Sequence, residues 1–212
     1  PALNYDSLHA KLDTLSFHID QDNFFAESNI KGYDTPIIYG KIDAVLDLAK
    51  TQKALGVTTA DLKGKLKMNL LVNGTYITNE STDLLKSIVQ IPNFDLDAKI
   101  QDGYFKYSDM PLGIENIQLE LTSSTKNGTL KGIELDIPKI NASARTNQIN
   151  GKIKINNVIE PEIDMDFKAN LILETLKDLI PLDSFDIKGT LNTTLKMKGI
   201  YSEEKKLFPV SN

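Results

Sequence analysis

Apolar and polar residues alternate along most of this chain. Between Phe94 and Gln101 the apolar side chains stand at every second position, with charged residues between them. A period of two residues is typical of a β-strand with one dry face and one wet face. The same alternation recurs in Leu15 to Ile19, Leu62 to Tyr76, Ile117 to Leu121, Ile133 to Ile137, Ile153 to Ile155, Ile163 to Leu171 and Phe185 to Tyr201. Turn residues such as Asn127-Gly128 separate the runs, so the pattern predicts an antiparallel meander.

Helical patterns are few. Leu46 to Leu55 and Leu171 to Ile180 hold apolar residues at spacings of three and four, and a third candidate is Asp83 to Gln90. In the third candidate, Ser81 or Thr82 can cap the start of the helix, and the nearby Pro92 prevents its continuation. The sequence therefore predicts two or three short helices beside a large β-structure.

One segment of the chain occurs twice. Asp61 to Tyr76 returns as Asp186 to Tyr201, with Asp, Lys, both Gly, two Leu and Tyr in register at an offset of 125 residues. This agreement predicts one β-rich unit used twice. We therefore expect equivalent strands in the two segments, with Gly64 and Gly189 in the same type of secondary structure.

The repeat also predicts how the chain is divided. We expect a first unit at 1–78, a helical connector at 79–92, a second unit at 93–202 and a tail at 203–212. The stretch from Asn93 to Leu121 has no full counterpart before Leu15. We therefore expect sequence upstream of Pro1 to complete the first unit.

The predicted strands present more apolar surface than the short helices can cover. Burial of one Leu or Ile side chain contributes about 1.5 to 3 kcal/mol, so a continuous apolar face in water is unfavourable. Either the sheet closes as a sandwich or barrel, or it curves into a half-pipe whose groove holds an apolar guest. The residues expected to line this groove or core are Leu66, Met68, Leu70, Phe94, Leu96, Ile100, Ile117, Leu119, Leu191, Leu195 and Met197.

The charge and composition argue against several classes of partner and site. The chain has 24 basic and 29 acidic residues and a net charge of −5, which argues against nucleic acid because phosphate contacts need a basic face. It has no cysteine, so it has neither a disulfide framework nor a thiolate zinc site. No apolar run is long enough to cross a bilayer, and we expect any signal or anchor segment to lie outside the sequence.

No catalytic or cofactor motif stands out. The two histidines, His9 and His18, are nine residues apart, which is not the i, i+4 spacing of a helical zinc site. The chain has no Gly-x-Ser-x-Gly elbow, phosphate-binding loop or dinucleotide-binding glycine run. We expect no enzymatic activity and no cofactor.

Two pairs of carboxylates are candidates for a cation site. Asp95 with Asp97, and Asp164 with Asp166, are two residues apart and project from the same side of their strands. Both pairs alternate with apolar residues, which favours a solvated strand face over a calcium site. We therefore expect no metal.

The second unit contains a distinctive set of strand and turn patterns: Pro92 to Tyr107, Ser108 to Pro111, Ile114 to Leu121, and the later run through Phe185-Asp-Ile-Lys-Gly-Thr-Leu191 to Lys198-Gly199. With these patterns the chain resembles the AsmA-like family of Gram-negative envelope proteins. The resemblance covers most of Pro92 to Tyr201, and a second partial copy covers about Leu15 to Tyr76. The sequence departs from the family pattern because it lacks the N-terminal membrane segment.

The resemblance implies a fold and a function. Similar proteins are anchored in the inner membrane, project repetitive β-sheet into the periplasm, and act in outer-membrane biogenesis and phospholipid transport along an apolar groove. The leading hypothesis is thus a non-enzymatic periplasmic protein with an elongated curved antiparallel sheet that shields acyl chains. Its expected partners are phospholipid or another acyl-chain lipid, and envelope proteins. The alternatives are a structural or adhesive β-sandwich array with a closed core, and a hydrolase with an unrecognised site.

Overall fold

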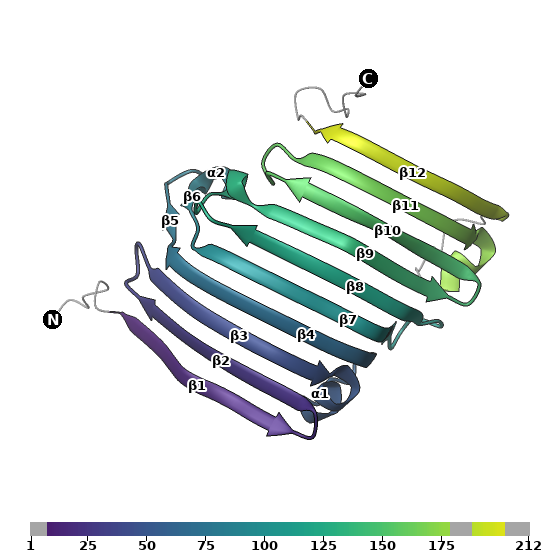
Figure 1. The fold of residues 1–212 in the computed structure, drawn as a ribbon, viewed down its shortest axis with the longest axis horizontal. Helices are drawn as coiled ribbons and strands as arrows, with labels where there is room; N and C mark the ends of the chain where they lie inside the picture. Colours follow the sequence, from purple (N-terminus) through teal and green to yellow (C-terminus); the bar gives the residue numbers. More distant parts are fainter. Residues whose placement is uncertain (1–7, 179–187, 202–212) are drawn as a thin grey trace.

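One large antiparallel sheet dominates the fold. The computed structural model describes residues 8–178 and 188–201. Ten strands lie side by side in the order β1-β2-β3-β4-β7-β8-β9-β10-β11-β12, each antiparallel to its neighbours (Figure 1). The prediction of a mainly β, antiparallel protein is confirmed. The sheet is not closed, because β1 and β12 are its two opposite edges and do not pair with each other.

Short segments join the long strands. The strands of the main sheet are β1 (His9–Ile19), β2 (Asp22–Lys31), β3 (Ile37–Asp47), β4 (Ala60–Thr75), β7 (Asn93–Tyr107), β8 (Ile114–Thr125), β9 (Glu134–Ala144), β10 (Asn147–Asn156), β11 (Glu162–Ile172) and β12 (Thr190–Ile200). The remaining elements are helix α1 (Leu48–Ala54), the small hairpin β5 (Ile77–Thr78) and β6 (Ile88–Gln90) with helix α2 (Leu84–Ser87), and 3-10 helices at Leu130–Gly132 and Leu173–Asp178. α1 follows β3 at one end of the long strands, and the β5–β6 hairpin lies at the opposite end of the strands (Figure 1).

The sheet forms a single layer. In the part of the chain that the structure describes, the strands contact mainly their sheet neighbours, and no second sheet or long helix packs across either face. The buried apolar residues of this part are mostly alanines: Ala26, Ala44, Leu46, Ala144 and Ala169. Large apolar side chains are therefore only partly covered, whereas most domains bury them between two layers.

The helices are shorter than the sequence pattern predicts. The sequence pattern predicts Leu46 and Leu171 as the first residues of two helices. Instead they lie in strands, one residue before the ends of β3 and β11. Within the described residues, the second of these helices is the 3-10 helix Leu173–Asp178 rather than an α-helix, and positions 179–180 of the predicted helix lie outside the described residues. In the third, Asp83 is the cap, since its carboxylate accepts hydrogen bonds from Leu85 N (3.1 Å) and Lys86 N (3.3 Å). Ser81 and Thr82 precede that cap, and Ile88–Gln90 is strand β6.

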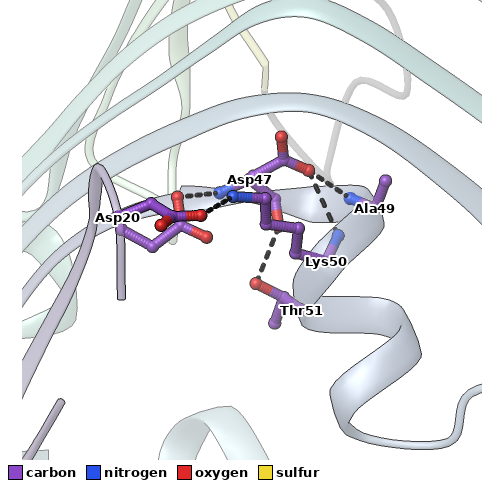
Figure 2. Close-up of polar contacts among 6 residues, drawn as sticks. Asp20, Asp47, Ala49, Lys50 and Thr51 are labelled. Atoms are coloured by element: carbon purple, nitrogen blue, oxygen red, sulfur yellow. Dashed lines mark hydrogen bonds and ion pairs between the residues drawn. The ribbon is translucent and has the colours of Figure 1, made fainter. Parts of the chain in front are cut away.

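A buried carboxylate keeps the end of β3 extended. Asp22 is 8% exposed, and its Oδ1 accepts a hydrogen bond from Asp47 N at 2.9 Å. Asp47 in turn caps α1, because its Oδ1 accepts from Ala49 N (3.0 Å) and Lys50 N (3.1 Å), as Figure 2 shows. The helix thus starts two residues later than its apolar spacing indicates, because the polar cap fixes the corner.

An exposed ion pair ties α1 to the β1–β2 turn. Lys50 Nζ lies 2.7 Å from Asp20 Oδ2 (Figure 2). The hydrogen bond and charge of Lys50 lower the pKa of Asp20 below its ordinary value.

The pair gives a pH-dependent prediction. Because the folded-state pKa of Asp20 is lowered, its stabilisation is present above the unfolded pKa of about 3.9 and is lost as pH falls through the folded pKa. Asp20→Asn should lower the melting temperature slightly at pH 7 and not at pH 2, since Asn tolerates the positive φ of 56° at this turn. Thermal unfolding of both proteins at the two pH values measures this, and an equal difference at both would contradict it.

Two sets of four strands share one layout. The bounds of β9, β10 and β11 are those of β1, β2 and β3 moved by 125 residues, and β12 ends at Ile200, 125 residues after Thr75. The registers agree as well: Leu46 faces Leu66 as Leu171 faces Leu191. The register shift between Leu12 and Leu15 of β1 recurs between Ile137 and Ile140 of β9.

The corners of the two sets also agree. Asp20 and Arg145, 125 residues apart, have φ values of 56° and 53°. Asn147 stands where Asp22 stands in the first set; it is 3% exposed and accepts a hydrogen bond from Ile172 N at 2.6 Å. These agreements extend beyond the segment in which the sequence repeat is visible.

The predicted equivalence of Gly64 and Gly189 holds only in part. Both have positive φ, 109° and 121°, but Gly64 lies inside β4, whereas Gly189 is a bend just before β12. The expectation that both lie in strands is therefore wrong. The physical reason is the strand beside each glycine. Residues 60–63 of β4 pair with β7 alone, and this pairing extends β4 past Gly64. β12 has no such second partner among the described residues, so it begins only after Gly189.

The division into units at 1–78, 79–92, 93–202 and 203–212 stays a prediction. Its connector contains α2 and β6, β5 lies at the end of the proposed first unit, and the proposed second unit begins at β7. The repeat segment before Lys188 and the tail after Tyr201 lie outside the described residues.

Candidate functional site

One face of the sheet is apolar from edge to edge. The strand registers place in a single row Leu15, Ala26, Ile42, Leu70, Leu96, Ser123, Leu135, Ile155, Ile163 and Gly199. Eight of these ten positions are apolar, and parallel rows on either side continue the pattern. Since neighbouring strands are about 4.8 Å apart, the row extends for roughly 40 Å across the sheet. We call this surface the apolar face.

All eleven residues that the sequence predicted as groove or core lining lie on the apolar face. In the centre, Leu66 pairs with Ile100, Leu70 with Leu96, and Leu119 with Ile140. At the edge, β12 contributes Leu191, Leu195 and Met197, of which Met197 pairs with Met165. The remaining predicted residues are Met68, Phe94 and Ile117, which face Ala98, Val72 and Gly103.

Exposure on the apolar face rises toward the edges. The predicted lining residues of β4, β7 and β8 are half-buried by one another, whereas Leu191 is 44% and Leu195 51% exposed. Leu15, Phe17 and Ile19 of β1 are exposed at the opposite edge. The edge strands lack a neighbour on one side, so their side chains lose half of their lateral contacts.

β-Bulges keep the face apolar where simple alternation would break it. Leu12 and Leu15 are three residues apart, yet the register shift between them leaves both on the apolar face, opposite Ser28 and Ala26. Ile137 and Ile140 of β9 repeat this arrangement around Pro138. Pro is tolerated inside a sheet at such bulges because one residue there does not join the ladder.

The sequence prediction missed part of the site. Phe24, Ile42 and Ala44 from β2 and β3 also lie on the apolar face, as do Phe167 and Ile155 from β10 and β11. A period of two in Ile163 to Leu171 pointed to β11. β2 was harder to predict, because Phe24 and Phe25 are consecutive apolar residues and break the period of two. Phe25 lies on the opposite face under Lys41, whose Nζ is 5.4 Å from the ring centroid.

The opposite face is polar and charged. Its ion pairs join neighbouring strands: Lys99 with Glu120 at 2.9 Å, and Lys196 with Asp166 at 3.3 Å. The hydrogen bond and charge of Lys99 lower the pKa of Glu120. Such exposed pairs contribute little to stability, and a solvated exterior accounts for this face.

The candidate cation ligands lie on this polar face. Asp164 is 3.5 Å from Lys198, and Asp95 and Asp97 lie opposite Ser124 and Thr122. Among the described residues, no group of three or more His, Asp or Glu side chains is arranged to hold a metal ion.

Both histidines lie in β1 and bond to asparagines of β2. His9 Nε2 is 2.7 Å from Asn29 Oδ1, and His18 Nδ1 bonds to Asn23 Oδ1. Each ring is exposed and is far along the strand from the other. They do not form a shared site.

No helix in the described ranges, 8–178 and 188–201, is long and apolar enough to cross a membrane. Comparisons with protein-family models, with curated proteins and with solved structures found no match for this chain. The candidate site therefore rests on the geometry of the sheet alone.

Proposed function

We propose that this protein binds the acyl chains of phospholipids or related lipids along the apolar face of its sheet and shields them from water. It acts without catalysis. The observation that carries the proposal is the single-layered sheet with an apolar face about ten strands wide and no covering layer in the described chain.

The energetics support a guest on this face. Soluble monomers rarely expose a continuous apolar patch larger than a few hundred Å², and larger patches mark binding sites. Every CH₂ group moved from water onto such a surface contributes about 0.8 kcal/mol when fully buried. A long acyl chain therefore gains several kcal/mol, and half-buried Leu and Ile side chains gain cover at the same time.

The dimensions suit an acyl chain. The hydrocarbon core of a bilayer is about 30 Å thick and two acyl chains deep, so one chain extends for about 15 Å. The apolar face, roughly 40 Å across, exceeds this length. A lipid tail can lie fully on the sheet while a polar head group reaches solvent at its margin.

The finer features of the proposal come from the sequence. In this reading the sheet curves into a half-pipe, residues 1–78 and 93–202 are related units, and the protein resembles AsmA-like envelope proteins. It would act in the periplasm of a Gram-negative cell in outer-membrane biogenesis and phospholipid transport, with a membrane-anchored full-length form. The shared registers and corners of the two strand sets support the related units.

Lipid analysis tests the proposal. The protein is purified without detergent, extracted with organic solvent, and the extract is examined by mass spectrometry for phospholipid. Leu195→Lys should carry less lipid than the parent with a small loss of stability, because Leu195 is exposed and a Lys side chain can extend its charge into water.

The alternative β-array makes the opposite prediction. If two copies close their apolar faces together as a sandwich, the parent is lipid-free and dimeric in light scattering, and Leu195→Lys dissociates the dimer. That outcome would overturn the lipid proposal. A monomer that carries phospholipid would support it.

A further inference from the structure

We infer that the outer edge of β12 is a docking site for a partner strand with the residue pattern of β7, paired antiparallel in the register that β7 adopts on β4. The partner is thus an extended segment with apolar residues at every second position and Asp or Lys between them. This inference is independent of lipid binding.

β12 is built like β4. All eleven pairs that join β12 to β11 have a counterpart 125 residues earlier, from Ile37 opposite Thr75 to Asp47 opposite Lys65. The end of each strand is fixed by the same bond: Tyr76 N donates to Pro36 O at 2.9 Å, and Tyr201 N donates to Pro161 O at 2.8 Å.

Unlike β12 in the described part of the chain, β4 has a partner strand on its other edge. Thirteen pairs join it to β7, from Ala60 opposite Tyr107 to Asn73 opposite Asn93. β12 is the last strand of the sheet, and no described strand occupies the corresponding position beside it. The first strand set therefore shows what kind of strand covers this edge.

The backbone of β12 directs hydrogen-bonding groups toward its outer edge. Gly189 O accepts from Leu173 N at 2.8 Å and Tyr201 N donates to Pro161 O, so these odd-numbered residues direct their backbone groups toward β11. Backbone groups alternate in direction along an antiparallel strand, which points those of Asn192, Thr194 and Lys196 outward. β12 contains neither a register shift nor a proline, two of the devices that protect an edge, and its lysines, Lys196 and Lys198, are confined to the last part of the strand.

The side chains of β12 are complementary to those of a β7-like strand. On the apolar face, a docked β7-like strand would set its equivalents of Ile100, Leu96 and Phe94 beside Leu191, Leu195 and Met197. On the polar face, β4 places Leu71 opposite Asp95 and Lys67 opposite Lys99. In β12, Lys196 corresponds to Leu71 and Asn192 corresponds to Lys67. A docked β7-like strand would therefore place its equivalent of Asp95 opposite a lysine, which makes an opposite-charge pair. Its equivalent of Lys99 would lie opposite an asparagine, which removes the like-charge pair. Such cross-strand pairs stabilise a sheet.

A peptide tests the inference. The probe is a fluorescently labelled synthetic peptide with the sequence of Asn93–Tyr107, titrated with the full chain and followed by fluorescence anisotropy. We expect saturable binding, and no binding of a scrambled peptide of the same composition. Since the chain has no cysteine, Thr193→Cys should form a disulfide with a peptide carrying Ala98→Cys when oxidised glutathione is added as the oxidant; this pair matches Met68 opposite Ala98.

Two substitutions at one position provide the control. Thr194→Pro removes an outward N–H without touching the β11 ladder and should weaken peptide binding by about tenfold or more. Thr194→Val keeps the N–H and should bind as the parent does. Equal binding by Thr194→Pro, equal binding by the scrambled peptide, or no binding by the parent overturns the inference. Self-association that Thr194→Pro abolishes also overturns it, because the occupant would then be a second copy.

Discussion

Leu70→Lys is expected to remove most of the bound lipid. Leu70 lies at the centre of the apolar face, between Ile42 of β3 and Leu96 of β7. A lysine there either leaves a cation against acyl chains or swings across the surface that the chains occupy. We expect about a tenfold fall in phospholipid per protein, with a loss of about 1 to 2 kcal/mol in unfolding free energy because the leucine is only half-buried. Quantitative lipid extraction and urea unfolding measure the two effects.

Leu71→Lys is the matched control. Leu71 is the next residue of β4, but it lies on the polar face, is 47% exposed and faces Lys41 and Asp95. The same substitution there should leave the lipid content unchanged and alter stability by about 0.5 kcal/mol or less. Equal lipid loss in the two variants would show that charge or general destabilisation, rather than the apolar face, governs lipid content.

Gly64→Ala is expected to destabilise the fold more than Leu70→Lys does. Gly64 has a φ of 109°, and a Cβ there would lie 2.7 Å from both Gln101 O and Gly103 Cα of β7. The contacts are with backbone, so no rotation of a side chain relieves them. We expect a loss of about 3 to 5 kcal/mol in unfolding free energy, measured by urea unfolding.

Gly189→Ala separates the two causes of that loss. Gly189 has a similar φ of 121°, but no described atom lies within 4 Å of the position of its Cβ. Only the backbone strain remains, so the expected loss is about 1 to 2 kcal/mol. If Gly64→Ala were no more harmful than Gly189→Ala, the close approach of β4 to β7 would not be important for stability.

The wrong and right predictions for the strands have different physical origins. The alternation in Phe94 to Gln101 predicted β7 well, because side-chain direction in a strand depends only on local sequence. Leu46 and Leu171 were predicted as helical from apolar spacing, but Asp22 and Asn147 hold the following residues in strands. Those two polar residues lie 25 positions away from the groups that they bond, so the local pattern contains no sign of them.

The bulges could not be predicted from periodicity either. Gln101 and Asp102 have no partner in β8, so the β7–β8 register shifts between Ile100 and Gly103. This shift lets Ile100 and Gly103 face the same side of the sheet. A bulge inserts a residue against a partner strand, so its position depends on the register of two strands together. The same limit applies to Gly64 and Gly189, whose different surroundings follow from whether a strand like β7 lies beside them.

The sequence by itself determined that the chain is mainly β, which residues of most strands are apolar, and that one segment recurs after 125 residues. These properties depend on spacing along the chain, and spacing is local. Only the tertiary structure decided that the strands form one open layer, that the eleven predicted lining residues share one face, and that β1–β4 and β9–β12 have the same register. Those properties depend on which strands pair and on whether a second layer covers them, and pairing joins residues that are far apart in sequence.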